Sequence, residues 1–401
     1  MSRGSAPELA PGRNMIYLDH HATTPVDPRV VQAMLPWLTE HFANAGSTTH
    51  EAGRWVGQQT SEAIATIASL LGAQPEELVI TSGATESNNL AILGACLHPR
   101  QKRRKVISVI TEHRAVIDPI QRLATHGFEI QWLPMHPSSD PRWGQIILEE
   151  ARKQIDDQTA LVSVMLANNE VGVIQPIAQL ADHCRSVGAL LHTDAAQCLG
   201  RMQIDVQSLG VDLLSFSGHK AYAPKGIGGL FVRQRPRLVR LLPQVIGGGQ
   251  QFNLRSGTLN TPGIHALRAA MELCRQDLAA DTAKLEQLSG RLHQLLQQGI
   301  DQLALNGPDP RHAPRLAGNL NLLFPGVEGQ SLMLRCPDLA CSSGSACTSA
   351  QPRPSHVLTA LGLDEDQARC CLRLGIGRTN TLEEIEQAAQ WLIDAYRSLR
   401  S

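Results

Sequence analysis

Short runs of apolar and β-branched residues recur between residues 78 and 232, and helical patterns separate most of them. We expect each run to form a buried strand: Leu78–Thr81, Val106–Ile110, Glu129–Leu133, Leu161–Leu166, Leu190–Thr193, Leu213–Phe216 and Gly229–Val232. Helical patterns fit between them, for example at Ser87–Cys96, Ala115–Thr125, Ile177–Val187 and Asp205–Leu209. This alternation is typical of a mostly parallel sheet with helices on both faces. The pattern therefore predicts an α/β fold.

The hydrophobic pattern changes after Pro262, where a long helical stretch extends from about Gly263 to Gly299. Short alternating segments such as Asn319–Phe324 follow it, and an amphipathic helix at Leu382–Leu399 closes the chain. We expect a flexible tail at 1–15, a large domain at 16–262 and a smaller α+β domain at 263–401. The first residues of the large domain are expected to pack against the small one. Upstream of the strands, we predict one helix at Arg29–His41 and a second ending near Leu71.

Polar, chemically capable residues follow five of the predicted strands. They are Thr81–Asn88, Thr111–His113, Ala167–Glu170, Asp194–Gln197 and Ser217–Lys220. In open α/β sheets, ligands bind beyond the carboxyl ends of the strands. Any one of these segments reads as an ordinary polar turn, but the coincidence of all five favours one shared pocket.

Composition narrows the possible functions only slightly. The 401 residues are 42% hydrophobic and 18% charged with a net charge of −1, which gives no indication of binding to nucleic acid or to a membrane surface. No apolar run approaches the ~18–20 residues of a membrane helix, and the first fourteen residues lack the apolar centre of a signal peptide, so we expect a cytoplasmic protein. The nine cysteines include no CxxC pair, which argues against a structural zinc site.

Three of the strand ends together carry parts suited to one cofactor. Gly83-Ala84-Thr85 opens a helix, where backbone amides and a hydroxyl can hold a phosphate. Asp194 can pair with a protonated heterocyclic nitrogen, and Lys220 can form an imine with an aldehyde; both belong to the chemistry of pyridoxal phosphate. Taken singly, Thr85 is equally an ordinary helix cap, Lys220 a surface lysine and His113 a core histidine. Adjacent His20 and His21 are read as a buried polar turn rather than a metal site.

A second unusual stretch, Cys341 to Ala350, places Cys347 among small polar residues. Such a composition cannot bury much apolar area, so we expect an exposed, mobile loop. Cysteine is usually buried, so a cysteine in such a loop is better explained by reactivity. Cys341 ends a more apolar segment and is expected to be structural.

These segments together resemble the cysteine desulfurases, a group within the class V aminotransferases, which are fold-type I pyridoxal-phosphate enzymes. The resemblance extends from about Ile16 to the last helix. It rests on Tyr17-Leu18-Asp19, Ala22-Thr23-Thr24-Pro25, Thr81–Asn88, Thr111–His113, Asn168–Glu170, His192–Gln197, Ser215–Lys220, Arg255–Thr258 and Ser342–Ser349. The last motif marks members with a long catalytic loop that serve iron–sulfur cluster assembly. One departure is Phe42-Ala43-Asn44-Ala45-Gly46, which lacks the family's proline.

The resemblance implies a role for each matching position. Lys220 would hold the pyridoxal phosphate covalently, Asp194 would pair with its ring nitrogen and His113 would stack on the ring. Asn169 and Gln197 would contact the phenolic oxygen side of the ring. Ala84, Thr85, Ser217 and His219 would hold the phosphate. Thr258 would reach the phosphate of a neighbouring subunit, which implies a homodimer.

The remaining implied roles concern the substrate. Arg373 and Asn169 would bind L-cysteine, with the carboxylate on Arg373. Cys347 would take the sulfur as a persulfide, leaving L-alanine, and would pass it to an iron–sulfur scaffold or another acceptor such as a thiolation protein. Through its persulfide, Cys347 could also serve as a transient iron–sulfur ligand. Rival interpretations are a selenocysteine lyase, another class V enzyme or a non-catalytic sulfur carrier. The presence of both Lys220 and Cys347 argues against the last.

Overall fold

The structure, a computed structural model, describes residues 15–343 and 354–401, so all but the last residue of the predicted tail lies outside it. Its centre is a seven-stranded sheet in the order β2-β8-β7-β6-β5-β3-β4. The strands are β2 (Leu78–Thr81), β3 (Lys105–Ser108), β4 (Glu129–Trp132), β5 (Thr159–Ser163), β6 (Leu190–Asp194), β7 (Leu213–Ser217) and β8 (Gly228–Val232). β8 runs antiparallel to both of its neighbours, β2 and β7, and all the other pairings are parallel. The predicted α/β fold with a mostly parallel sheet is confirmed.

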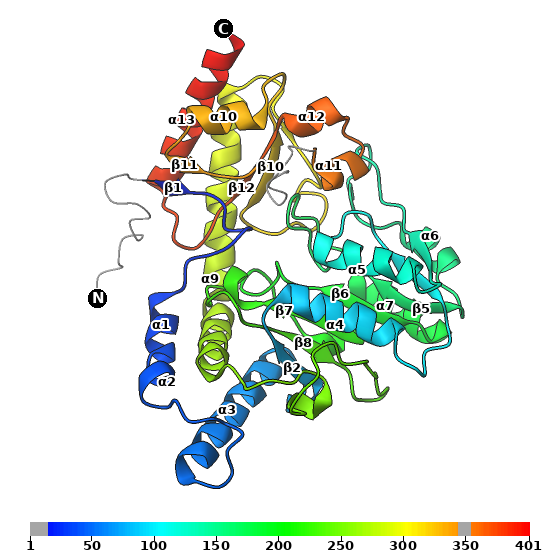
Figure 1. The fold of residues 1–401 in the computed structure, drawn as a ribbon. Coiled ribbons are helices and arrows are strands. Elements are labelled where there is room, and N and C mark those ends of the chain that lie inside the picture. The colour runs from blue at the N-terminus through cyan, green and yellow to red at the C-terminus, as the bar shows by residue number, and fades with distance from the viewer. Residues whose placement is uncertain (1–14, 344–353) are drawn as a thin grey trace.

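Helices cover both faces of this sheet (Figure 1). Successive residues of a strand point to opposite faces, and they divide accordingly: Val106 packs with α4 (Ala84–Cys96) and α5 (Arg114–Ala124), whereas Ile107 packs in the opposite core. The core on that opposite face contains residues of α3 (Glu51–Leu70), α6 (Leu148–Gln154), α7 (Ile177–Val187) and α8 (Val206–Leu209). Being buried on both faces, the inner strands show largely continuous apolar runs instead of strict alternation, whereas the edge strand β4 is partly exposed.

A second hydrophobic core lies under a three-stranded antiparallel sheet in the order β12-β10-β9. Its elements are β9 (Ala304–Leu305), β10 (Asn319–Leu323), β12 (Cys371–Gly375), α10 (Gly329–Arg335) and α13 (Leu382–Arg400). Two further helices, α11 (His356–Ala360) and α12 (Glu365–Arg369), precede β12. The first strand, β1 (Ile16–Tyr17), pairs with β11 (Leu339–Ala340), so the start of the chain belongs to this second core.

The long helix α9 (Thr261–Gly299) connects the two cores (Figure 1). Ile264 and Leu267 are buried in the core of the large sheet, whereas Leu285 and Leu292 are buried in the second core. The first turn of α9 begins close to the boundary that the sequence suggested. Its amino-terminal half nevertheless packs with the large sheet.

Most predicted elements agree with the structure to within two or three residues. The helix predicted at Arg29–His41 is wrong as a single element, because it divides into α1 (Pro28–Met34) and α2 (Pro36–Thr39). Pro36 has no amide hydrogen to continue the ladder, which ends the first helix at the preceding residues. Short 3-10 turns complete the inventory: η1 (Pro75–Glu77), η2 (Gly218–Lys220) and η3 (Gln251–Asn253).

Candidate active site

A cavity of about 490 Å³ opens at the carboxyl ends of the parallel strands. All the predicted site residues within the described part of the chain line it, except Thr258: Ala84, Thr85, His113, Asn169, Asp194, Gln197, Ser217, His219, Lys220 and Arg373. Most of these come from the turns after β2, β3, β5, β6 and β7, as expected for a site at this edge of the sheet. Ser342 and Arg373 close the cavity from the second core.

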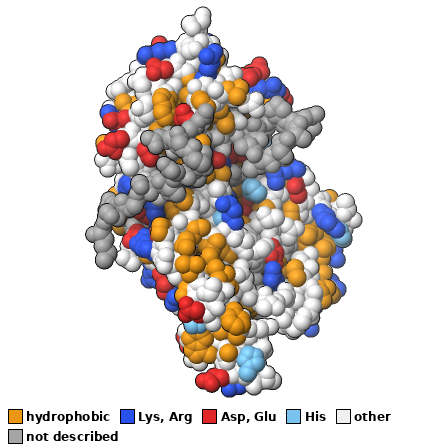
Figure 2. Space-filling model, turned by 60° about the vertical axis from the view of Figure 1, so that its left-hand side comes forward, with side chains coloured by type: hydrophobic (Ala, Val, Ile, Leu, Met, Phe, Trp, Pro, Cys, Tyr) orange, Lys and Arg blue, Asp and Glu red, His pale blue; other side chains and the backbone are white. Residues whose placement is uncertain are grey.

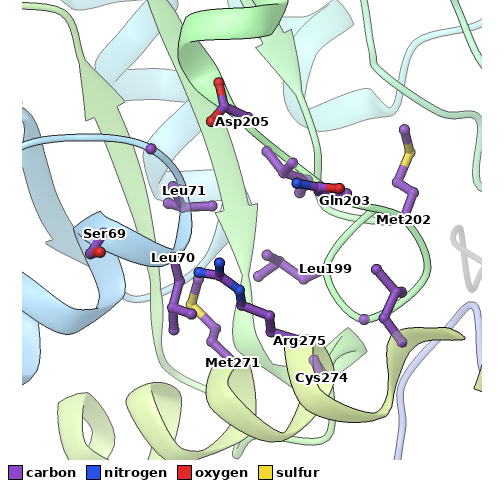
Figure 3. Close-up of a pocket in the computed structure, with 14 residues that line it drawn as sticks. Ser69, Leu70, Leu71, Leu199, Met202, Gln203, Asp205, Met271, Cys274 and Arg275 are labelled. Carbon is purple, nitrogen blue, oxygen red and sulfur yellow. The ribbon is translucent and has the colours of Figure 1, made fainter.

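Another cavity, of about 400 Å³, lies between the end of α3, the segment 199–205 and α9. Figure 3 shows that leucine side chains such as Leu70, Leu71 and Leu199 line it together with polar side chains, among them Gln203, Asp205 and Arg275. None of the predicted site residues lies there. Asp205 is engaged in accepting a hydrogen bond from the Ser208 amide at 2.7 Å, as the cap of α8. The chemistry therefore belongs to the first cavity.

The turn between β2 and α4 has the geometry of an anion cradle. Gly83 caps α4 with a φ of 147° and supplies no side chain to the first amides of the helix, so these remain available to a ligand in the cavity. Gly228 of β8 passes directly behind this turn, where a Cβ atom would lie 2.7 Å from the Gly83 Cα. The Ser217 hydroxyl also lies next to this turn: a Cβ atom added at Gly83 would be 3.4 Å from it.

Asp194 presents a buried carboxylate at the end of β6. Its Oδ1 accepts a hydrogen bond from the Ala196 amide at 2.8 Å, and its Oδ2 accepts one from Nδ2 of Asn88 at 2.7 Å. Both hydrogen bonds fix the position of the Asp194 carboxyl group. Sequence reasoning missed the part played by Asn88. The available signal was an amide side chain in a predicted helix whose following residues, Leu90–Cys96, are mostly apolar.

His113 follows β3 and caps α5, where its Nδ1 accepts a hydrogen bond from the Ala115 amide at 3.0 Å. In the neutral ring this leaves the proton on Nε2. Burial, and then the charge of Lys220, lower the pKa of His113. Lys220 ends the turn η2 after β7 and reaches the same cavity.

His219 lies beside Lys220 and has a pKa lowered to about 4, first by burial and then by Lys220 and Lys225. It is therefore neutral at physiological pH. Its Nδ1 lies 3.1 Å from Oγ1 of Thr23, which belongs to the turn after β1.

Gln197 is fixed by two hydrogen bonds with a single residue, His21. Its Nε2 donates to the His21 carbonyl at 3.0 Å, and its Oε1 accepts from Nδ1 of the His21 ring at 3.0 Å. Burial holds the pKa of His21 well below its usual value. Both His20 and His21 are buried, as the sequence suggested. No group of three or more potential metal-ligating side chains occurs within residues 15–343 and 354–401.

Arg373 extends from β12 into the cavity, and its guanidinium group already makes several hydrogen bonds within the protein. Its Nη2 donates to Asp19 at 2.8 Å and to the Ser342 hydroxyl at 3.2 Å, and its Nη1 donates to the Asn169 carbonyl at 3.2 Å. Its Nε is buried and has no hydrogen-bond partner within residues 15–343 and 354–401. The sequence did not reveal Asp19 as a partner, because 354 positions separate the two residues.

Two predicted site residues are not placed in the cavity. Thr258 is exposed and does not line it. Cys347 lies outside the described residues, although Ser342, just upstream of it in the chain, forms part of the cavity wall.

The family model described as Aminotransferase class-V matches residues 16–388, so the chain belongs to the class V aminotransferase family. It is 45% identical to the cysteine desulfurase IscS of Rickettsia akari over 96% of this chain and 92% of that protein. Among solved structures, a NifS-like protein matches with a TM-score of 0.85 and 32% identity, covering 96% of this chain and 99% of the other. A structure described as SspA in complex with cysteine matches with a TM-score of 0.76 and 32% identity, covering 90% and 98%. Within the family, the chain belongs to the cysteine desulfurases.

Cysteine desulfurases are pyridoxal-phosphate enzymes, and this chain is one as well. The groups that line the cavity fit this cofactor independently of the family match. It offers uncapped helix amides for a phosphate, a buried hydrogen-bonded carboxylate for a ring nitrogen, and a lysine for an aldehyde.

Proposed function

We propose that this chain converts L-cysteine into L-alanine and collects the released sulfur as a persulfide on Cys347. The sulfur would then serve iron–sulfur cluster assembly or thiolation. One observation carries the proposal. A single cavity brings Lys220, His113 and Asp194 together with Arg373, and Ser342 in its wall begins the motif that contains Cys347.

Each residue has a task that follows from its surroundings. Asp194, held in place by Asn88 and the Ala196 amide, would pair with the ring nitrogen of the cofactor, which when bound supplies an electron sink for the substrate Cα. The Lys220 amine holds the cofactor and then carries the Cα proton of the substrate. His113, neutral and fixed through Nδ1, would cover the ring with its Nε2 proton available for transfer.

Arg373 orients the substrate by its carboxylate. Because Asp19 already engages Nη2, the incoming carboxylate shares the guanidinium with Asp19 or displaces it. Asn169 adjoins Arg373 through its carbonyl and contacts both substrate and cofactor.

The thiolate of Cys347 then attacks the substrate sulfur. A sulfur–sulfur bond forms and the carbon–sulfur bond breaks. The electron pair of the broken bond remains with the carbon fragment, which takes up a proton at Cβ, regains its Cα proton from Lys220 and leaves as alanine.

We further propose that the enzyme acts as a homodimer in which Thr258 reaches the phosphate of the neighbouring subunit. Support comes from its exposed position outside its own cavity. Large apolar side chains are also exposed, including Phe42 at 78%, Ile246 at 86% and Phe252 at 64%. Figure 2 shows apolar side chains gathered on the lower half of the molecule, which contains the large sheet. Patches of this kind mark protein interfaces.

Among the described helices, none has both the length and the apolar composition that a membrane span requires.

The test of the proposed function is an assay of alanine and sulfide formed from L-cysteine in the presence of a thiol reductant. We expect Lys220→Ala to abolish both products, and Cys347→Ser to abolish persulfide and sulfide. Cys370→Ser is the matched control, because Cys370 is a partly exposed thiol outside the cavity. If Cys347→Ser released sulfide at the rate of Cys370→Ser, the assigned nucleophile would be wrong. If the unmodified enzyme formed no alanine, the whole proposal would fail.

A further inference from the structure

Thr24 is a buried residue outside the cavity, and the reaction described above gives it no task. Its hydroxyl donates a hydrogen bond to the His219 carbonyl and accepts one from the Tyr222 amide, both at 2.9 Å. The backbone amide of Thr24 also donates to the His219 carbonyl, at 2.9 Å. A single side chain, 195 positions from His219 in the sequence, therefore holds the backbone on both sides of Lys220.

The backbone just beyond Lys220 needs such support. Tyr222 has a φ of 63°, in the left-handed region that bulky side chains rarely adopt. A residue keeps this conformation only where its surroundings hold it firmly. The Tyr222 carbonyl accepts from the Asp27 amide at 3.0 Å, and its hydroxyl accepts from the Arg378 amide at 2.8 Å. The guanidinium carbon of Arg378 lies 3.9 Å from the centre of the Tyr222 ring. Together with Thr24, these contacts fix the chain two residues after the lysine.

The turn that leads to Thr24 also holds the side chain proposed to bind the substrate. Asp19 accepts the 2.8 Å hydrogen bond from Nη2 of Arg373. Between Asp19 and Thr24 the chain is bonded to itself, because the amides of Ala22 and Thr23 donate to the Asp19 carbonyl at 2.9 and 3.4 Å. A short segment therefore contacts the substrate-binding guanidinium at one end and the backbone around the cofactor lysine at the other.

The relative placement of these two groups matters because of the shape of the substrate. In L-cysteine the carboxylate and the proton to be removed are both attached to Cα. Arg373 acts on the one and Lys220 on the other, although they come from β12 and from the turn after β7, which belong to different sheets. A misplacement near 1 Å between reacting groups can cost up to about a hundredfold in rate.

We propose that Thr24 is a positioning residue for Lys220, and that the segment from Asp19 to Thr24 sets the placement of the lysine amine relative to the Arg373 guanidinium. The inference rests on the proposed function, because it takes Lys220 as the carrier of the Cα proton. The long side chain of Lys220 can absorb part of an error in its backbone, so the expected loss is smaller than a hundredfold.

The experiment compares Thr24→Val with Thr24→Ser in the cofactor-loaded enzyme. Val has nearly the shape of Thr but lacks the hydroxyl, whereas Ser retains it, and both keep the backbone amide that bonds His219. Thr60→Val is the matched control, because Thr60 is also buried, does not line the cavity and donates to the Val56 carbonyl at 2.7 Å within α3. Thr24→Ala removes the same hydroxyl without placing a methyl group there, and it replaces the Val variant if that variant does not fold.

Three quantities are measured. They are the single-turnover rate of alanine formation from ordinary and from Cα-deuterated L-cysteine, the KM for L-cysteine, and the rate at which the absorption of bound pyridoxal phosphate is lost on dialysis. We expect Thr24→Val to slow alanine formation about tenfold and to raise the ratio of the two rates, because removal of the Cα proton by Lys220 becomes slower than the other steps. The KM should remain unchanged, since Asp19 still holds Arg373. Cofactor loss should become several times faster, because Lys220 is less well placed to hold the cofactor. Thr24→Ser and Thr60→Val should behave like the unmodified enzyme.

An unchanged rate and isotope ratio in Thr24→Val would overturn the assignment. An equal loss in Thr24→Ser would do the same, because the hydroxyl would then not be the cause, and an equal loss in Thr60→Val would indicate a merely structural role. Slower alanine formation with an unchanged isotope ratio would place the effect on a step other than proton transfer by Lys220. Failure of the proposed function is separate, because the unmodified enzyme would then form no alanine from L-cysteine.

Discussion

His20 allows a quantitative prediction about acid stability. The ring is buried, neither of its nitrogens has a hydrogen-bond partner among the described residues, and it lies edge-on to Tyr17 with ring centres 4.9 Å apart. Burial, and then the charge of Arg201, lower its pKa from 6.5 to about 3. The folded protein therefore keeps His20 neutral at a pH where the unfolded chain binds a proton.

The sign and size of the effect follow from this difference in proton binding. Above pH 6.5 neither state is protonated at His20, and no stability is lost. Below it, the unfolded state gains protons and stability falls by up to about 1.4 kcal/mol per pH unit. The expected loss from His20 is about 1.4 kcal/mol at pH 5.5 and about 2.7 kcal/mol at pH 4.5, continuing until the pH reaches about 3.

We expect His20→Leu, which removes the titrating group at similar volume, to reduce this loss. The measurement is the free energy of unfolding in urea at pH 7.5, 6.5 and 5.5 for both proteins in their cofactor-loaded form. Other buried histidines titrate in both, so the difference isolates His20. The exposed His312 provides the control His312→Leu, which should keep the full acid dependence. Parallel loss of stability in His20→Leu and the unmodified protein would refute the reasoning.

Three further predictions follow from buried contacts. Burial, and then the charge of Asp194, raise the pKa of Glu112 well above its usual value, so the folded state retains a proton that the unfolded state releases. Glu112→Gln should therefore stabilise the protein more at pH 8 than at pH 6, and equal shifts in melting temperature would contradict this. Gly228→Ala would place a Cβ 2.5 Å from the Phe216 carbonyl and should weaken cofactor retention on dialysis about tenfold, whereas Gly290→Ala, with open space, should not. Asn88→Ala removes the donor to Asp194 and should lower kcat about tenfold with little change in KM; an unchanged kcat would count against its role.

The sequence was sufficient where local pattern determines structure. Leu78–Thr81 forms the predicted strand residue for residue, because a short β-branched run bounded by a turn has few alternatives. The prediction of a single helix at Arg29–His41 was wrong, because Pro36 has no amide hydrogen to donate and divides the segment into two helices. The strand ends met in one cavity because parallel strands place their carboxyl ends along one edge.

The partners of the site residues could not be predicted in the same way. The contacts of Asn88 with Asp194 and of Thr24 with His219 join positions 106 and 195 residues apart. They depend on how whole elements pack, which no local pattern encodes. The roles of Thr258 and Cys347 remain predictions from resemblance.

The long helix α9 has a consequence for how this chain could be divided or recombined. Its 39 residues extend about 60 Å, and one half is buried in each core. A chimera joined at residue 262 would transplant Ile264 and Leu267 away from the partners that bury them. Between Cys274 and Leu285 the helix contains no buried residue, so a crossover there would leave both cores intact. A segment exchanged together with the large sheet should therefore include the amino-terminal half of α9.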